Sequence, residues 1–165
     1  MRRGTRDLMA GSHVILGAVA WTWAAPRLGL PRFSPASLAL VTLGSLLPDV
    51  DHPSSWVGRR LRFVSRPLAR VFGHRGFTHS LVAAALCGAA LASQGAGRTV
   101  VAPVVVGYLA HLAADLLTPR GLRLAWPLRR SFALPVCRTG SAGEALLVAG
   151  LLAWSVVELA GLRPR

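Results

Sequence analysis

Long apolar runs, broken by short polar segments, decide what this chain is able to fold into. Five runs made mainly of Ala, Leu, Val and Gly occupy residues 13–25, 37–47, 81–92, 100–117 and 145–162. They lack the alternation of apolar and polar residues that marks a β-strand, so helices are favoured. With 53% hydrophobic and only 15% charged residues, the composition excludes an ordinary soluble domain. We therefore expect one all-α, polytopic membrane domain over residues 1–165.

The lengths of the runs limit how many helices cross the bilayer. Crossing takes about 20 apolar residues, and only the last two runs approach that length. The first two runs stop at Pro26 and Pro48, and the first three need tilt, flanking residues or a locally thinner bilayer to span. We expect about five mostly short transmembrane helices, or four if one run does not span.

All 19 basic residues are arginine, against 6 acidic residues, which gives a net charge of +13. The arginines lie between the apolar runs, so membrane topology explains them and no nucleic-acid partner is expected. Segments that alternate across the membrane carry 14 arginines on one side and 5 on the other. The positive-inside rule then predicts a multi-pass protein of the inner (cytoplasmic) membrane with its N-terminus in the cytoplasm. An alternative treats residues 1–25 as a signal peptide, which leaves four helices.

Four polar islands hold all five histidines and three of the four aspartates. They cover residues 11–13, 47–52, 74–79 and 111–115. By the arginine count, each island lies at the cytoplasmic end of its apolar run, although the count used no information about histidines. Histidine and aspartate bind divalent metals and move protons near neutral pH. Their convergence at one membrane face predicts a common site.

Spacing within the islands fits a site, although each pattern also has a structural explanation. His111 and Asp115, at i and i+4, share a helix face and either reach one ion or form a packing pair. Asp49, Asp51 and His52 place two carboxylates and an imidazole within four residues. The structural explanation makes one of these aspartates a helix cap.

The third island places His74 and His79 on either side of a turn at Gly76. Thr78 is predicted to be the N-cap of the helix over 81–92, which would put His79 at the N-terminus of that helix. Both histidines alternatively contact lipid headgroups. His13 is the weakest candidate ligand by itself, and it is included because it lies at the same predicted membrane face as the other islands.

Together the islands supply up to eight ligands for one or two divalent ions, and zinc, manganese and iron are not distinguished. Such an ion activates a water molecule for hydrolysis, and a free carboxylate then serves as general base. Asp49 and Glu144 are the candidates for that base, although Glu144 alternatively caps the start of the last helix or is a further ligand. Arg75 and Arg120 are candidate clamps for an anionic group. The eight candidate ligands are His13, Asp49, Asp51, His52, His74, His79, His111 and Asp115.

The motifs L-P-D-V-D-H-P, H-R-G-F-T-H-S, G-Y-L-A-H-L-A-A-D-L-L-T-P-R-G and an early G-S-H resemble those of the YdjM/YbcI-type family. Its members are bacterial and archaeal inner-membrane proteins described as LexA-regulated, metal-dependent hydrolases. The resemblance extends in the same order from about residue 10 to Glu144. It implies a membrane-embedded metal site built from the eight candidate ligands, and it favours a functional role for Glu144.

The expected function is a membrane-bound metal-dependent hydrolase, which uses metal-activated water on a membrane-proximal ester, phosphoester or amide. Membrane lipids are the expected partners, and a lipid or lipid-linked substrate suits a polar site in an apolar scaffold. One alternative is a metal-binding transporter or sensor. The position of the ligands argues against it, because they cluster at one membrane face and do not line a path across the bilayer. The other is a non-catalytic membrane scaffold. Neither the substrate nor the oligomeric state follows from the sequence.

Overall fold

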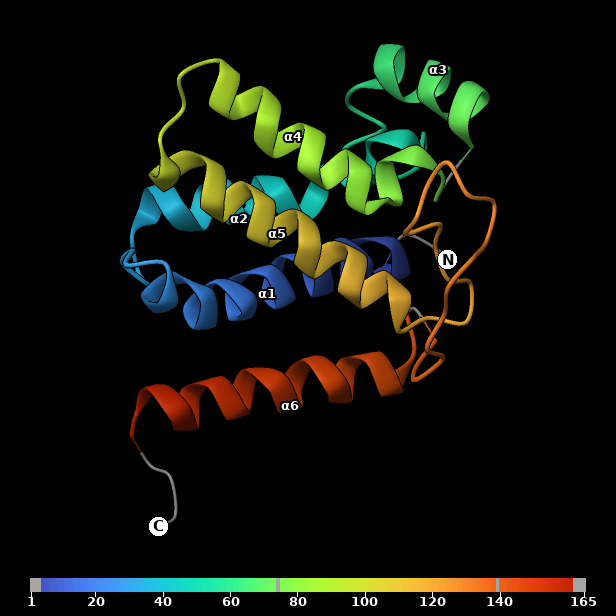
Figure 1. The fold of residues 1–165 in the computed structure, drawn as a ribbon. Coiled ribbons are helices and arrows are strands. Elements are labelled where there is room, and N and C mark those ends of the chain that lie inside the picture. Colours follow the sequence, from blue (N-terminus) through green and yellow to red (C-terminus); the bar gives the residue numbers. More distant parts are fainter. Residues whose placement is uncertain (1–3, 74, 139, 162–165) are drawn as a thin grey trace.

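The computed structural model describes residues 4–73, 75–138 and 140–161, and within them it is all-helical (Figure 1). An isolated bridge between Leu122 and Phe132 is the β-type pairing found in these residues. The predicted all-α class is therefore confirmed. The helices are α1 (Gly4–Arg27), α2 (Pro35–Leu46), η1 (Pro48–Asp51), α3 (Arg62–Phe72), η2 (Phe77–His79), α4 (Leu81–Ser93), α5 (Arg98–Leu116) and α6 (Ala142–Leu159), where η denotes a 3₁₀-helix.

Local sequence explains several helix ends. α1 continues through Pro26, which has no N–H to donate to the carbonyl of Thr22, and Arg32 Nε donates to that carbonyl instead at 3.1 Å. Ser80, and not Thr78, is the N-cap of α4, because the Ser80 hydroxyl accepts the N–H of Ala83. The assignment of Thr78 as N-cap was wrong, since its hydroxyl donates to the buried carboxylate of Asp51.

Two helices, α5 and α6, are long and apolar enough to cross a bilayer by length and composition. This is fewer than the four to five spans that the sequence predicted. α2 and α4 have only 12 and 13 residues, and α1 begins with a polar segment that includes Arg6 and Asp7. The apolar window of α5 is 39% buried within the protein, whereas that of α6 is 11% buried. Most of the α6 surface is therefore exposed and apolar.

α5 is the centre of the bundle and packs against α1, α2 and α4. Its closest neighbour is α2, because glycines on both helices let the backbones meet. A Cβ atom built on Gly107 would lie 2.2 Å from the carbonyl oxygen of Val41, and one on Gly44 would lie 2.1 Å from that of Val104. Only glycine fits at both positions without moving a helix.

The described residues of the polar islands lie together at one end of the bundle. Figure 1 shows the start of α1, the end of α5, the beginnings of α4 and α6, and α3 at that end. The irregular connection over residues 117–141 also lies there, since it hydrogen-bonds to the end of α5 and to the start of α4. The chain reversals at this end bring segments that are distant in sequence into one cluster.

We predict that Gly107→Ala destabilises the bundle, because the added methyl overlaps the α2 backbone. Overpacking of this kind typically costs about 1–3 kcal/mol. The matched control is Gly150→Ala in α6, where nothing lies within 4 Å of the added Cβ. Thermal unfolding followed by circular dichroism should show a lower midpoint for Gly107→Ala alone, and equal midpoints for both variants would contradict the close α2–α5 packing.

Candidate metal centre

Five side chains from four elements direct nitrogen or oxygen atoms toward one another. His13 comes from α1, Asp49 from η1, His79 from η2, and His111 and Asp115 from the last turns of α5. Four of them are buried, and Asp49 is half-buried. The i, i+4 spacing of His111 and Asp115 places both on the face of α5 that meets the other three, as the sequence analysis predicted. These five residues are called the donor cluster below.

The distances within the donor cluster suit ligands around an ion. Asp115 Oδ2 lies 3.3 Å from His79 Nε2 and 3.6 Å from His111 Nε2, and Asp115 Oδ1 lies 3.8 Å from His13 Nε2. Asp49 Oδ1 lies 3.8 Å from His79 Nε2 and 3.9 Å from His111 Nε2. Two ligands bound tetrahedrally at about 2.1 Å from a zinc ion are themselves about 3.4 Å apart. The separations therefore leave room for a cation between the donors.

The donor cluster divides into two overlapping groups of possible ligands. His13, His111 and Asp115 form one group, and Asp49, His79 and His111 form the other, with the donor atoms of each group within 4.8 Å of one another. His111 belongs to both groups. Two sets of three ligands that share a residue provide for one ion, or for two neighbouring ions.

The tautomer of His111 is fixed by a hydrogen bond on the side of the ring that faces away from the carboxylates. Its Nδ1 lies 2.7 Å from the carbonyl oxygen of Ser45, which only accepts, so Nδ1 carries a proton. In the neutral ring Nε2 is then unprotonated and faces Asp49 and Asp115, and it is buried without a hydrogen-bond partner among the described residues. A buried nitrogen lone pair with no donor is a ready ligand for a metal.

Asp51 acts behind His79 and does not point into the donor cluster with Asp49. Its fully buried carboxylate lies 3.3 Å from His79 Nδ1 and accepts a hydrogen bond from the Thr78 hydroxyl. The opposite nitrogen of His79 faces Asp49 and Asp115. This is the carboxylate–histidine arrangement that orients metal-binding imidazoles in proteins. The structure thus gives the two aspartates of the second island different positions.

The carboxylates favour positive charge at this place. Burial alone lowers the pKa of His79, but hydrogen bonds and charge from Asp115 and Asp51 outweigh burial and raise the pKa to about 9. The same carboxylates would stabilise a divalent cation.

Arg75 pairs with the donor cluster through Asp115. Its guanidinium donates to Asp115 Oδ1 at 2.7 Å, to Thr118 Oγ1 at 3.0 Å and to the carbonyl of Gly121 at 3.2 Å. The backbone of Arg75 has a φ of 62°, which is strained for a residue with a side chain. These contacts occupy much of the hydrogen-bonding capacity of the guanidinium that was predicted to clamp an anionic group, and they hold Asp115 Oδ2 toward the histidines.

The remaining candidates are not part of the donor cluster. Glu144, in the first turn of α6, accepts the N–H of Gly140 and lines a small cavity together with His13 and Asp115. Among the described residues, neither group of possible ligands includes His52, whose ring lies 3.4 Å from Ser54 Oγ. His74 lies outside the described residues. Sequence reasoning missed the partners Ser45 and Thr118, because nothing local marks a residue that contacts a site through a distant segment.

The fold and the donor cluster define a class of helical membrane protein with a buried site of histidine and aspartate. The model of the YdjM inner membrane protein family matches residues 8–163, and the chain belongs to this family. The family resemblance stated from the motifs is thereby confirmed, and membership places the chain among inner membrane proteins.

Curated relatives show the same membership. The chain is 46% identical over 121 residues to the inner membrane protein YdjM of Escherichia coli (strain K12) and to that of Shigella flexneri. The aligned region covers 69% of this chain and 62% of each relative. It is 33% identical over 142 residues to YvsG of Bacillus subtilis (strain 168), which covers 85% of this chain and 87% of that protein. No solved structure matches the chain.

We predict that Asp51→Asn weakens metal binding without abolishing it, because it removes the charge that orients His79. Loss of an outer partner of this kind typically costs about 10–100-fold in metal affinity. His111→Ala, which removes a residue common to both groups of ligands, should abolish stoichiometric binding. Zinc and manganese titration of the purified variants measures both effects.

The control is His52→Ala, which should bind metal as the unaltered chain does. A loss of binding in His52→Ala equal to that in His111→Ala would contradict the donor cluster as described.

Proposed function

We propose that this chain is a metal-dependent hydrolase of the inner membrane, with a site at the cytoplasmic face that cleaves a membrane-proximal ester, phosphoester or amide. The observation that carries the proposal is the donor cluster, in which three imidazoles and two carboxylates converge in a buried place. In a His–Asp pair that serves only packing, each residue needs a single partner. Here His111 and Asp115 each face several nitrogen or oxygen atoms that are able to bind a metal.

The donor set fits a borderline divalent ion such as zinc, manganese or iron, since it mixes imidazole nitrogen with carboxylate oxygen. His13, His79, His111 and Asp115 would hold one ion, which leaves the Asp49 carboxylate free to act as general base. Where two ions bind, Asp49 would be a ligand and Glu144 would be the base. When bound, such an ion lowers the pKa of a coordinated water and polarises the bond to be cleaved. Asp51, Ser45 and Arg75 hold the ligands in place through the contacts described above.

Asp49 is the best candidate for the general base. Its side chain is 25% exposed, whereas that of Asp115 is 4% exposed and is paired with Arg75. Asp49 therefore combines contact with the donor cluster and access to solvent, which a group needs in order to take a proton from an attacking water. Glu144, beside His13 and Asp115, is the second candidate.

The cytoplasmic orientation follows from the arginines at the same end of the bundle. The connection over residues 117–141 carries five exposed arginines, and α3 carries three more. An excess of arginine marks the cytoplasmic side. In this topology shorter helices complete the multi-pass fold beside α5 and α6, and the N-terminus is cytoplasmic.

We predict that purified protein contains stoichiometric divalent metal and hydrolyses members of a panel of phosphoesters, esters and amides. Asp49→Asn should lower kcat by about 10²–10⁴, the usual contribution of a general base. The matched variant Glu144→Gln, at the second candidate, should lower kcat less than Asp49→Asn does. Metal analysis by mass spectrometry of each variant separates a lost base from a lost ion. Protein that is folded but binds no divalent metal would overturn the proposal.

A further inference from the structure

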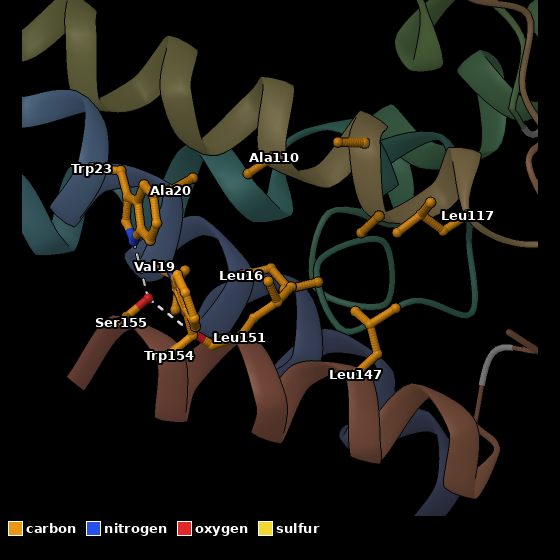
Figure 2. Close-up of a pocket in the computed structure, with 12 residues that line it drawn as sticks. Leu16, Val19, Ala20, Trp23, Ala110, Leu117, Leu147, Leu151, Trp154 and Ser155 are labelled. Atoms are coloured by element: carbon orange, nitrogen blue, oxygen red, sulfur yellow. Dashed lines mark hydrogen bonds between the residues drawn. The ribbon is translucent and has the colours of Figure 1, made fainter. Parts of the chain in front are cut away.

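An apolar groove runs between α1, α5 and α6 (Figure 2). Its volume is about 490 Å³, and its lining is almost wholly apolar, with Leu16 and Trp23 from α1, Ala113 from α5, and Leu147, Leu151 and Trp154 from α6. A cavity of this size is in the range of small-molecule binding sites.

The groove opens on the exterior of the helix bundle, where the exposed surface of α6 is apolar. α6 packs mainly on α1, and Ala113, Leu151 and Trp154 are exposed although they line the groove. One end is closed, because Trp23 Nε1 donates to Ser155 Oγ at 3.0 Å across α1 and α6 (Figure 2). An apolar molecule dissolved in the membrane is therefore able to enter from the side and is stopped at Trp23.

The other end of the groove leads to the donor cluster. A smaller cavity shares Leu16, Ala114, Leu117 and Leu147 with the groove, and it is also lined by the candidate ligands His13 and Asp115 and by Glu144. Along α1, ten residues separate Trp23 from His13, which corresponds to about 15 Å of helix. An extended hydrocarbon chain has the shape to occupy that length.

The polar end favours a negative head group. The connection that joins α5 to α6 carries five exposed arginines, which are Arg120, Arg123, Arg129, Arg130 and Arg138. Arg120 lies two residues after Thr118 and Arg138 directly follows Cys137, and both Thr118 and Cys137 line the smaller cavity. Guanidinium groups pair with phosphate and carboxylate, and arginines at the membrane surface attract anionic lipids.

We propose that this groove holds the hydrocarbon tail of an amphiphilic substrate with an anionic head group, whose scissile bond then lies at the His13–Asp115 end. The reaction rests on the proposed function, but binding of the tail is a separate property. A second copy of the chain, packed along α6, is the rival occupant.

Tail binding is tested on the full chain in nanodiscs, with a phosphatidylglycerol that carries a diazirine near the end of one acyl chain. Photolabelling should concentrate on α1 and α6 around Val19 and Leu151. Ala113→Phe fills the groove from an exposed position and should lower that labelling about tenfold. The matched control is Ala85→Phe on the exposed face of α4, which should leave the labelling unchanged.

Activity then separates this proposal from the previous one. Ala113→Phe should lose hydrolysis of long-chain substrates about tenfold while it keeps hydrolysis of short-chain, water-soluble analogues and full metal content. Metal-dependent hydrolysis that is equally fast in both Phe variants, with labelling spread evenly over the lipid-facing helices, would overturn the groove and keep the hydrolase. Groove labelling without any hydrolysis would overturn the hydrolase and keep the groove. Crosslinks between copies through Leu151→Cys that exclude the lipid would identify a dimer face instead.

Discussion

The negative charge of the buried Asp115 carboxylate has to be balanced by partners in the surrounding structure. A charge inside an apolar bundle costs several kcal/mol unless it is paired. Arg75 meets one oxygen of Asp115, and His79 and His111 face the other. Because these partners come from the segment before α4 and from α5 itself, the carboxylate adds a polar link to the apolar packing of Phe77 and α4 against α5. A bound cation would also balance the charge of Asp115. The stability and the proposed chemistry of this end of the bundle therefore both depend on the Asp115 carboxylate.

The close approach of α2 and α5 converts that pairing into a site. Gly44 and Gly107 bring the two backbones together, and the carbonyl of Ser45 thereby reaches His111 Nδ1. The next turn of the chain is η1, which follows α2 almost directly and presents Asp49 to the same histidine. Gly44, next to Ser45, and Gly107, one turn before His111, thus help to determine which nitrogen of His111 faces the carboxylates. The apolar groove begins one turn away, so polar chemistry and a membrane-facing cavity share a wall.

The sequence predicted the helical class, the family and the gathering of the histidine and aspartate islands, because apolar runs and ligand-type residues are visible without coordinates. It correctly singled out the last two apolar runs as long enough to span, but it predicted four to five spans, and α2 and α4 are short while α1 starts with polar residues. It also treated all ligand-type residues alike. The structure places Asp51 behind His79, directs Arg75 to Asp115 and leaves His52 beside Ser54.

Composition and spacing by themselves determined that this chain forms apolar helices with histidine and aspartate at their ends, because periodicity and burial cost are local properties of the residues. Which of those side chains face one another was decided by the tertiary structure. Orientation of a ligand depends on partners such as the Ser45 carbonyl for His111 and the Arg75 guanidinium for Asp115, and these come from distant segments whose proximity only helix packing creates. The groove between α1, α5 and α6 likewise exists only because α6 packs loosely on the bundle, a property that no residue of α6 carries alone.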